Sequence, residues 1–191
     1  VFEMGLKNGP WIFNYNNGET WKKGNFLNDK KNGSWATWYE NGTTAFKGNY
    51  TLDLEDGLWT SWYENGQQKD LGTFNNGAME KTWEGWYPNG IQKYEGNYKG
   101  DLKSGIWKYW TDKGIFKDEE TYKTFLISGK VSKREVLRSY KHGTSKSYDQ
   151  IQGKLVSEGS YYKGKQDGLW KYYFPGGEIA NRELNYKEGK L

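Results

Sequence analysis

A ten-residue phrase rich in tryptophan recurs along this chain at a constant spacing. It reads "GLWTSWYENG" from Gly57 and "GSWATWYENG" from Gly33. Its first tryptophans are 24 residues apart, and a glycine lies thirteen residues after four of them. The two columns are Trp11, Trp35, Trp59, Trp83 and Trp107, and Gly24, Gly48, Gly72 and Gly96. Residues of the same type that recur at the same spacing over five copies predict a repeat architecture.

Each copy is predicted to form a β-hairpin, because an Asn-Gly pair recurs between aromatic, strand-forming segments. Asn-Gly favours a two-residue type I′ turn, in which both central residues have positive φ. If Asn41-Gly42 is such a turn, Trp35 faces Gly48 across the hairpin. We therefore expect the indole to lie over the opposite glycine, where a bare backbone leaves room for the ring.

Alternation along a strand predicts two different faces. The first tryptophan of each phrase should lie on a core face. The second lies three positions on and should point the other way, opposite Ala45, Lys69, Lys93 or Lys117. We call this second row the tryptophan comb: Trp38, Trp62, Trp86 and Trp110. The comb and Lys69, Lys93 and Lys117 are the candidate partner-binding residues.

The repeat loses its period after Trp107. Phe125 takes the tryptophan position in one degenerate copy, with Arg138 in the glycine position, and Ser145 takes it in the next. The regular form returns at Trp170. The sequence thus predicts regular repeats over 1–122, a degenerate basic region over 123–147 and C-terminal repeats over 148–191. The basic region is either a solvated edge or a specific contact region; its cations include Lys130, Lys133, Arg134, Arg138, Lys141 and Lys146.

Composition favours an extended structure supported by aromatic stacking. Aromatic residues make up 18% of the chain, yet mean hydropathy is −1.08 and 26 residues are glycine. A net charge of +4 is too small to predict nucleic-acid binding. The absence of cysteine excludes disulfides and leaves the compartment open. No apolar run is long enough for a transmembrane segment. If a signal peptide was removed before Val1, the protein would lie in the envelope or outside the cell.

The stretch "YEGNYKGDLKSGIW", Tyr94 to Trp107, resembles the MORN repeat, with tryptophan in place of its last glycine. The "WYENG" form that follows in neighbouring copies resembles the MORN-variant repeat of bacterial proteins of the YwqK-type antitoxin family. The resemblance covers residues 9–122 well and 143–189 loosely. It implies an all-β, elongated, single-layer antiparallel meander of about eight stacked hairpins. It also implies a cytoplasmic immunity protein that neutralises a toxin.

Little in the sequence favours catalysis. The one histidine, His142, is expected at the surface or in a turn, and Cys-His catalysis and ordinary zinc sites lack their ligands. Glu119-Glu120 and the acidic run Asp53, Glu55 and Asp56 are expected to be solvated charges at turns. We therefore predict no catalytic residue, metal or cofactor.

A non-catalytic protein-binding module is the predicted function. The alternatives are a structural or envelope-associated scaffold and, less favoured, a binder of glycans or single-stranded nucleic acid.

Overall fold

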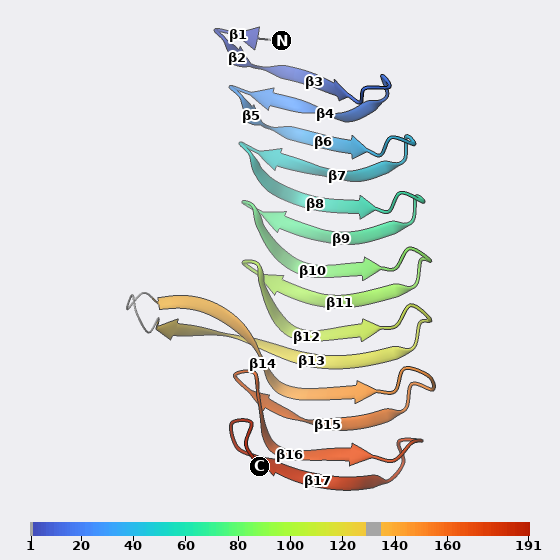
Figure 1. The fold of residues 1–191 in the computed structure, drawn as a ribbon. Coiled ribbons are helices and arrows are strands. Elements are labelled where there is room, and N and C mark those ends of the chain that lie inside the picture. The colour runs from blue at the N-terminus through green and yellow to red at the C-terminus, as the bar shows by residue number, and fades with distance from the viewer. Residues whose placement is uncertain (1, 129–134) are drawn as a thin grey trace. The chain divides into compact units, whose positions relative to one another are not determined.

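The computed structural model describes residues 2–128 and 135–191, which form an all-β antiparallel meander of consecutive hairpins (Figure 1). The predicted fold class is confirmed. The chain divides into two compact units, residues 1–90 and 91–191. The sequence-based division at residues 122 and 147 stays a prediction.

The first unit is a meander in which β3, β4, β6, β7, β8, β9 and β10 follow one another. The short β5 also pairs with β4, and β1 pairs with β2. The strands are β1 (Phe2–Glu3), β2 (Leu6–Lys7), β3 (Gly9–Asn14), β4 (Thr20–Leu27), β5 (Lys30–Lys31), β6 (Gly33–Trp38), β7 (Thr44–Thr51), β8 (Leu54–Trp62), β9 (Gln68–Asn75) and β10 (Ala78–Trp86).

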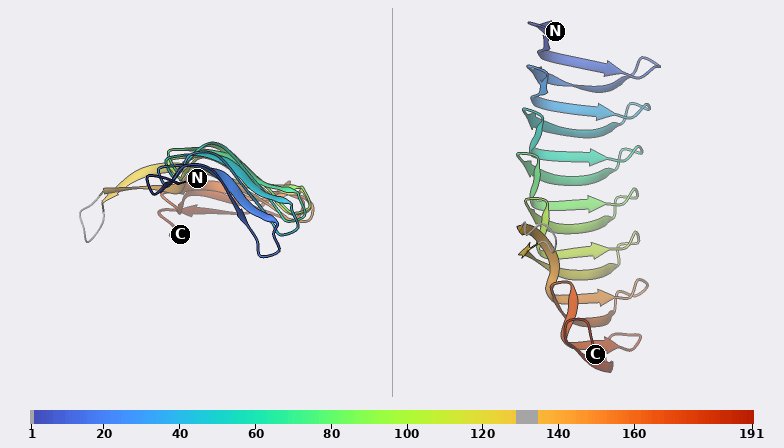
Figure 2. Two further views of the ribbon diagram at one scale, coloured as in Figure 1. Left: turned by 90° about the horizontal axis from the view of Figure 1, so that it is seen from above. Right: turned by 60° about the vertical axis from the view of Figure 1, so that its left-hand side comes forward.

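The second unit continues the same pattern with longer strands in its middle. All neighbours in sequence pair antiparallel, and β13 and β14 form a two-stranded arm that extends beyond the other strands of this unit (Figures 1 and 2). The strands are β11 (Gln92–Lys99), β12 (Leu102–Trp110), β13 (Phe116–Ser128), β14 (Glu135–Tyr148), β15 (Leu155–Tyr162), β16 (Lys165–Tyr173) and β17 (Ala180–Tyr186).

The predicted register of the hairpins is confirmed in the first unit. Trp35 is opposite Gly48, and Gly33 is opposite Tyr50. The pairs Trp59–Gly72 and Trp11–Gly24 follow the same rule. A tryptophan and the glycine thirteen residues after it are therefore opposite each other in the hairpin.

The Asn-Gly tips differ from the predicted type I′ turn. Gly42 has φ of +80°, but Asn41 is outside the positive-φ region. Gly42 N donates to Tyr39 O at 3.0 Å, and Tyr39 N donates to Thr43 O at 2.8 Å. This is the pattern of a type I turn followed by a left-handed glycine, which makes a three-residue loop. The extra residue shifts the ladder by one position beyond Thr37.

Positive-φ two-residue turns occur instead at the opposite ends of the strands. Leu52 and Asp53 have φ of +51° and +75° between the paired residues Thr51 and Leu54. Asp53 Oδ1 accepts a hydrogen bond from Lys31 N at 2.7 Å, and Asp53 N donates to Lys31 O at 2.9 Å. The acidic residue therefore ties its turn to the preceding one, a role beyond that of a solvated charge.

The indole that covers each glycine comes from the next hairpin, which corrects the expectation that Trp35 covers Gly48. A Cβ built on Gly48 would lie 2.3 Å from Cδ2 of Trp59. Between β7 and β8 the ladder passes from Lys47–Thr60 to Asn49–Asp56, so three residues of β8 stand against Gly48. This bulge places the Trp59 ring over the glycine. Other indoles cover glycines in the same way: Trp35 over Gly24, Trp83 over Gly72, Trp107 over Gly96 and Trp170 over Gly159.

The same indoles are hydrogen-bonded to the preceding hairpin. Trp59 Nε1 donates to Asn49 O at 3.1 Å. The bond recurs from Trp35 to Asn25, Trp83 to Thr73, Trp107 to Asn97 and Trp170 to Ser160, at 2.9 to 3.2 Å. Each covering tryptophan thus joins two successive hairpins.

Alternating rings form a continuous aromatic row in the first unit. Trp35 packs edge-to-face against Phe26 and Tyr50, with ring centroids 5.0 and 6.1 Å away. The series continues through Trp59, Phe74 and Trp83 at 5.1 to 5.5 Å. Such pairs contribute about 0.5–1.5 kcal/mol each beyond area burial. We call this row the spine; its Trp35 is only 2% exposed.

Replacing Gly48 by alanine is expected to destabilise the protein by about 1–3 kcal/mol, because the new methyl group overlaps the Trp59 ring. The free energy of unfolding in urea measures the effect. In a Trp59→Ala background the penalty should fall below about 0.5 kcal/mol, as expected when the clashing partner is gone. A penalty that disappears with Trp35→Ala instead would contradict this arrangement.

Candidate functional site

The comb residues lie at the ends of strands, next to the Asn-Gly loops. Trp38, Trp62 and Trp86 are the last residues of β6, β8 and β10, and Trp110 is the last residue of β12. All four side chains are half-buried. They differ in this from Trp35, Trp83, Trp107 and Trp170 of the core face, which are buried.

Lys69 and Lys117, which were predicted to stand opposite the comb, do not occupy those ladder positions. Trp38 pairs with Thr44, Trp62 with Gln68 and Trp110 with Phe116, because the three-residue loops shift the register by one. The Trp62 ring instead has Lys47 Nζ 5.9 Å from its centroid.

The predicted binding lysines lie elsewhere near the loops. Lys69 Nζ is 5.7 Å from the centroid of the Tyr63 ring. Lys117 is within 3.8 Å of the Asp118 carboxylate, and Lys93 is an exposed residue of β11.

Tyrosine hydroxyls of the preceding repeat hold the backbone of the comb in the first unit. Tyr39 donates to Trp62 O at 2.9 Å. Tyr15 makes the same bond to Trp38 O at 2.7 Å, and Tyr63 makes it to Trp86 O at 2.9 Å. Neighbouring loops are also linked, since Asn41 Nδ2 donates to Glu64 O at 3.1 Å and Asn65 Nδ2 to Pro88 O at 2.8 Å. The comb is therefore displayed on a fixed backbone.

Exposed aliphatic side chains share the comb face of the first unit. Leu58 precedes the spine residue Trp59 and so points to the opposite side, where it is 61% exposed. Ile12 is also 61% exposed. Near it lies a hollow of about 300 Å³, with Pro10, Ile12, Lys23, Asn25, Ser34 and Ala36 in its lining. These side chains were not predicted from the sequence, although Leu58 stands in a "GLW" triplet and Ile12 directly follows Trp11.

The second unit has its own aliphatic side chains in the equivalent positions. Ile106 and Leu169 precede Trp107 and Trp170, and they are 51% and 45% exposed. Their apolar surface therefore repeats the feature found at Leu58.

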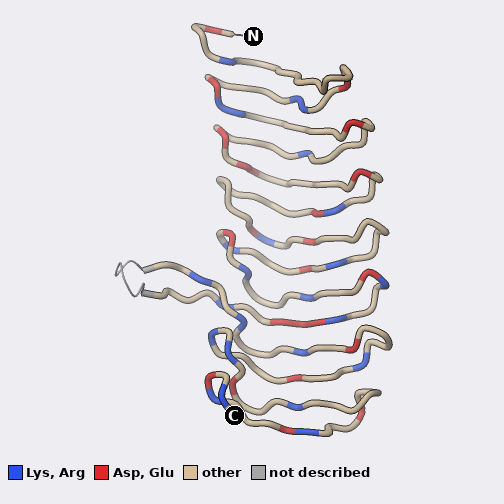
Figure 3. Tube along the Cα trace, in the orientation of Figure 1, with Lys and Arg blue, Asp and Glu red and all other residues tan. Residues whose placement is uncertain are grey.

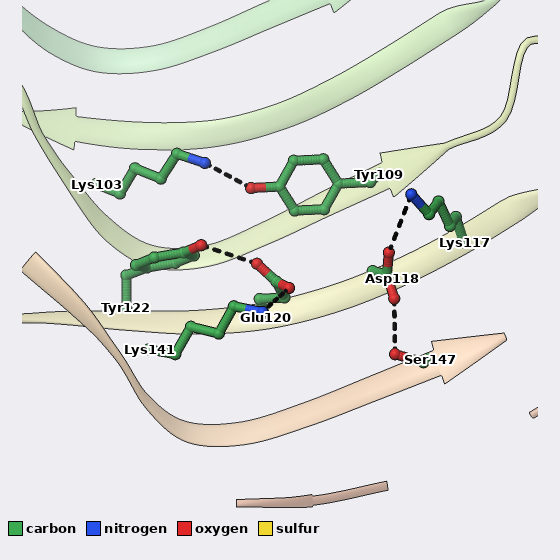
Figure 4. A network of polar contacts seen from close by, with 8 residues as sticks. All are labelled: Lys103, Tyr109, Lys117, Asp118, Glu120, Tyr122, Lys141 and Ser147. Atoms are coloured by element: carbon green, nitrogen blue, oxygen red, sulfur yellow. Dashed lines mark hydrogen bonds and ion pairs between the residues drawn. The ribbon is translucent and has the colours of Figure 1, made fainter. Parts of the chain in front are cut away.

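Two sets of polar contacts form a cluster in the second unit, Lys103 with Tyr109 and Tyr122 with Glu120 and Lys141 (Figure 4). Lys103 Nζ lies 5.1 Å from the centroid of the Tyr122 ring. Lys103 Nζ donates to Tyr109 Oη at 2.7 Å and lies 4.2 Å from the centroid of the Trp107 ring. Tyr122 Oη donates to Glu120 at 2.8 Å, and Glu120 also pairs with Lys141. Burial lowers the pKa of Lys103 and raises the pKa of both tyrosines, because it disfavours their charged forms.

Lys31 occupies in the first unit the place that Lys103 has in this cluster. Lys31 Nζ donates to Tyr50 Oη at 3.3 Å and lies 5.4 Å from the Trp35 ring centroid. Burial, followed by the negative charge of Glu55, raises the pKa of Tyr50 to about 12.

The residues considered for catalysis have structural surroundings. His142 lies in β14, half-buried between the rings of Phe125 and Tyr162 at 5.0 and 5.3 Å, and not in a turn. Glu119 and Glu120 lie within β13, away from a hairpin end. Within residues 2–128 and 135–191, His, Asp and Glu side chains form no cluster of three that could hold a metal ion.

Charges of both signs are interspersed along the strands of each unit (Figure 3). The structure describes only part of the predicted basic region, because Lys130, Lys133 and Arg134 lie outside the described residues. In the part of the chain that the structure describes, no helix has the length and apolar character needed to cross a bilayer.

The family described as "MORN repeat variant" matches the chain at residues 55–76 and 166–191. These segments contain parts of β8–β9 and of β16–β17, one hairpin in each unit. The repeat type predicted from the sequence is thus supported at two places. No curated protein matches the chain.

Stability should decrease at alkaline pH partly because of Tyr50. Its neutral form is favoured in the folded state, where the pKa is about 12 against 10.0 for an unperturbed tyrosine. The stabilisation is complete below pH 10 and is lost as pH rises through 12. We expect the urea midpoint of the wild type to fall more steeply over this range than that of Tyr50→Phe. Equal slopes would contradict the assignment.

Proposed function

We propose that this protein is a non-catalytic protein-binding module whose comb face in the first unit contacts the partner. The observation that carries the proposal is the row of half-buried indoles of Trp38, Trp62 and Trp86, whose backbone carbonyls are held by tyrosine hydroxyls. A partner can bury this surface without first ordering the backbone that presents it.

The chemistry of this face suits a protein surface. Tryptophan is enriched among residues that dominate interface energies, and neighbouring exposed apolar side chains mark interaction sites. Leu58 and Ile12 supply aliphatic area, and Lys23 and Lys47 supply polar contacts beside it. A pure scaffold would not require such large apolar side chains in contact with water.

Nucleic acid is the less favoured ligand because acidic residues are interspersed with the basic ones along the strands of each unit (Figure 3). Binding through phosphates requires several cations on one face and weakens steeply with salt. A protein interface built on indoles should change much less with salt. Measuring the affinity at two ionic strengths therefore separates these classes of partner.

The finer form of the proposal is that the partner is a bacterial toxin, which this protein neutralises as an immunity protein. Its support is the resemblance of the "WYENG" repeat to the repeats of an antitoxin family. The gene next to this one supplies the first candidate, and co-expression tests whether this protein relieves its toxicity. A failure of this test would reject the toxin and leave the protein-binding surface to be tested separately.

The double variant Trp62→Ala, Trp86→Ala is expected to weaken partner binding by about 2 kcal/mol or more, as loss of interface anchors does. Its thermal midpoint should remain close to that of the wild type, because both rings are only half-buried. Calorimetric titration of the captured partner, with circular dichroism of each variant, provides both readouts.

Phe174→Ala is the matched control, since it removes an aromatic ring that is 54% exposed in the second unit, away from the comb face of the first. It should bind like the wild type. Wild-type affinity of the folded double variant, or equal losses in both variants, would exclude the comb as the contact surface.

A further inference from the structure

The β13–β14 arm closes one side of a cleft in the second unit. Beyond the shared ladder, the two strands pair with each other alone, from Lys123–Tyr140 to Ser128–Glu135. Ser139 Oγ donates to Lys103 O, which ties the base of the arm to β12. The arm is therefore fixed where it leaves the sheet of this unit (Figure 2).

The cleft has a volume of about 510 Å³, within the range of small-ligand sites. Its lining comes from the end of β11, from the β11–β12 turn, from β12 and from the base of the arm. The residues are Tyr98, Asp101, Leu102, Lys103, Tyr122, Arg138, Ser139 and Tyr140. Three tyrosine rings and Leu102 offer apolar surface, and the hydroxyl groups offer hydrogen bonds.

Two cations of the lining, Lys103 and Arg138, make no ion pair with a described carboxylate. Lys103 Nζ has the Tyr109 hydroxyl as its hydrogen-bond partner. Among the described residues no carboxylate lies within 4.0 Å of Lys103 or Arg138, and Glu120 is already paired with Lys141 and Tyr122. Asp101 contributes one negative charge, so the lining carries a net charge of +1 from Lys103, Arg138 and Asp101.

Burial disfavours the charged form of Lys103, and the negative charge of Glu120 offsets this only in part, since the pKa of Lys103 is still lowered. An anion bound beside the ammonium would offset more of that cost. Arginine adds a planar donor group suited to carboxylate or phosphate oxygens. We propose that this cleft binds a small organic anion, with its carboxylate or phosphate group between Lys103 and Arg138 and its apolar part against the tyrosines. This site is separate from the comb and does not depend on the proposed function.

Benzoate and phenyl phosphate are suitable probes, because each joins one of the two anionic groups to a ring, and benzyl alcohol is their neutral counterpart. Titrations of the full chain followed by amide NMR should give saturable shifts at Lys103 and at Ser139 and Tyr140. Benzyl alcohol should give none. A response to benzoate alone would indicate a carboxylate ligand, and a response to phenyl phosphate alone would indicate a phosphate ligand. A response to both would indicate a site that accepts either anionic group.

Arg138→Gln should weaken binding at least tenfold, and Lys103→Met should do the same if it folds. Arg138 is exposed, so its variant keeps the test valid where Lys103→Met fails to fold. Lys31→Met is the matched control, because Lys31 has the equivalent place over Trp35 in the first unit. Absence of saturable binding, equal binding of benzyl alcohol, or unchanged affinity in Arg138→Gln would overturn the proposal.

Discussion

An indole lying over the bare backbone of a glycine is the interaction on which the rest of this structure depends. Trp59 can cover Gly48 only because no Cβ occupies the space 2.3 Å from its ring. The hydrogen bond from Trp59 Nε1 to Asn49 O fixes the ring in that place. Thirteen residues separate a tryptophan from its ladder glycine, and eleven separate that glycine from the indole above it, so a repeat of 24 follows.

This interaction also explains how a chain with few aliphatic residues is stabilised. Trp59, for example, contacts the preceding Gly48 and stands between the rings of Tyr50 and Phe74, so its hairpin is held by the one before it. Stability in such repeats is approximately a sum of repeat and nearest-neighbour terms. In the second unit Ser145 of β14 stands opposite Gly159 where a tryptophan would be expected, and the same strand β14 forms the arm together with β13.

The sequence predicted the hairpins and their pairing because spacing alone determines ladder partners. It could not identify the ring above Gly48, since that depends on a bulge in which three residues of β8 oppose one of β7. Counting from Asn41-Gly42 likewise gave Trp38 the partner Ala45, whereas the three-residue loop makes it Thr44. These errors arise from local backbone geometry, which residue order does not reveal.

The comb and the cleft differ in how far the sequence could predict them. Alternation placed Trp62 on the face opposite Trp59, and Leu58 could have been placed there by the same rule. The cleft depends on a contact between Ser139 and Lys103, 36 residues apart. The sequence marked 123–147 as irregular and basic, but only the fold brings Arg138 to the same cleft as Lys103.

Ring-current shifts in the proton NMR spectrum test the central claim most directly. A glycine beneath an indole face has Hα resonances moved strongly upfield. We expect such shifts for Gly48, and we expect them to be lost when Trp59 is replaced by leucine and retained when Trp35 is replaced by leucine. Shifts that depend on Trp35 and not on Trp59, or ordinary Gly48 shifts in the wild type, would contradict it.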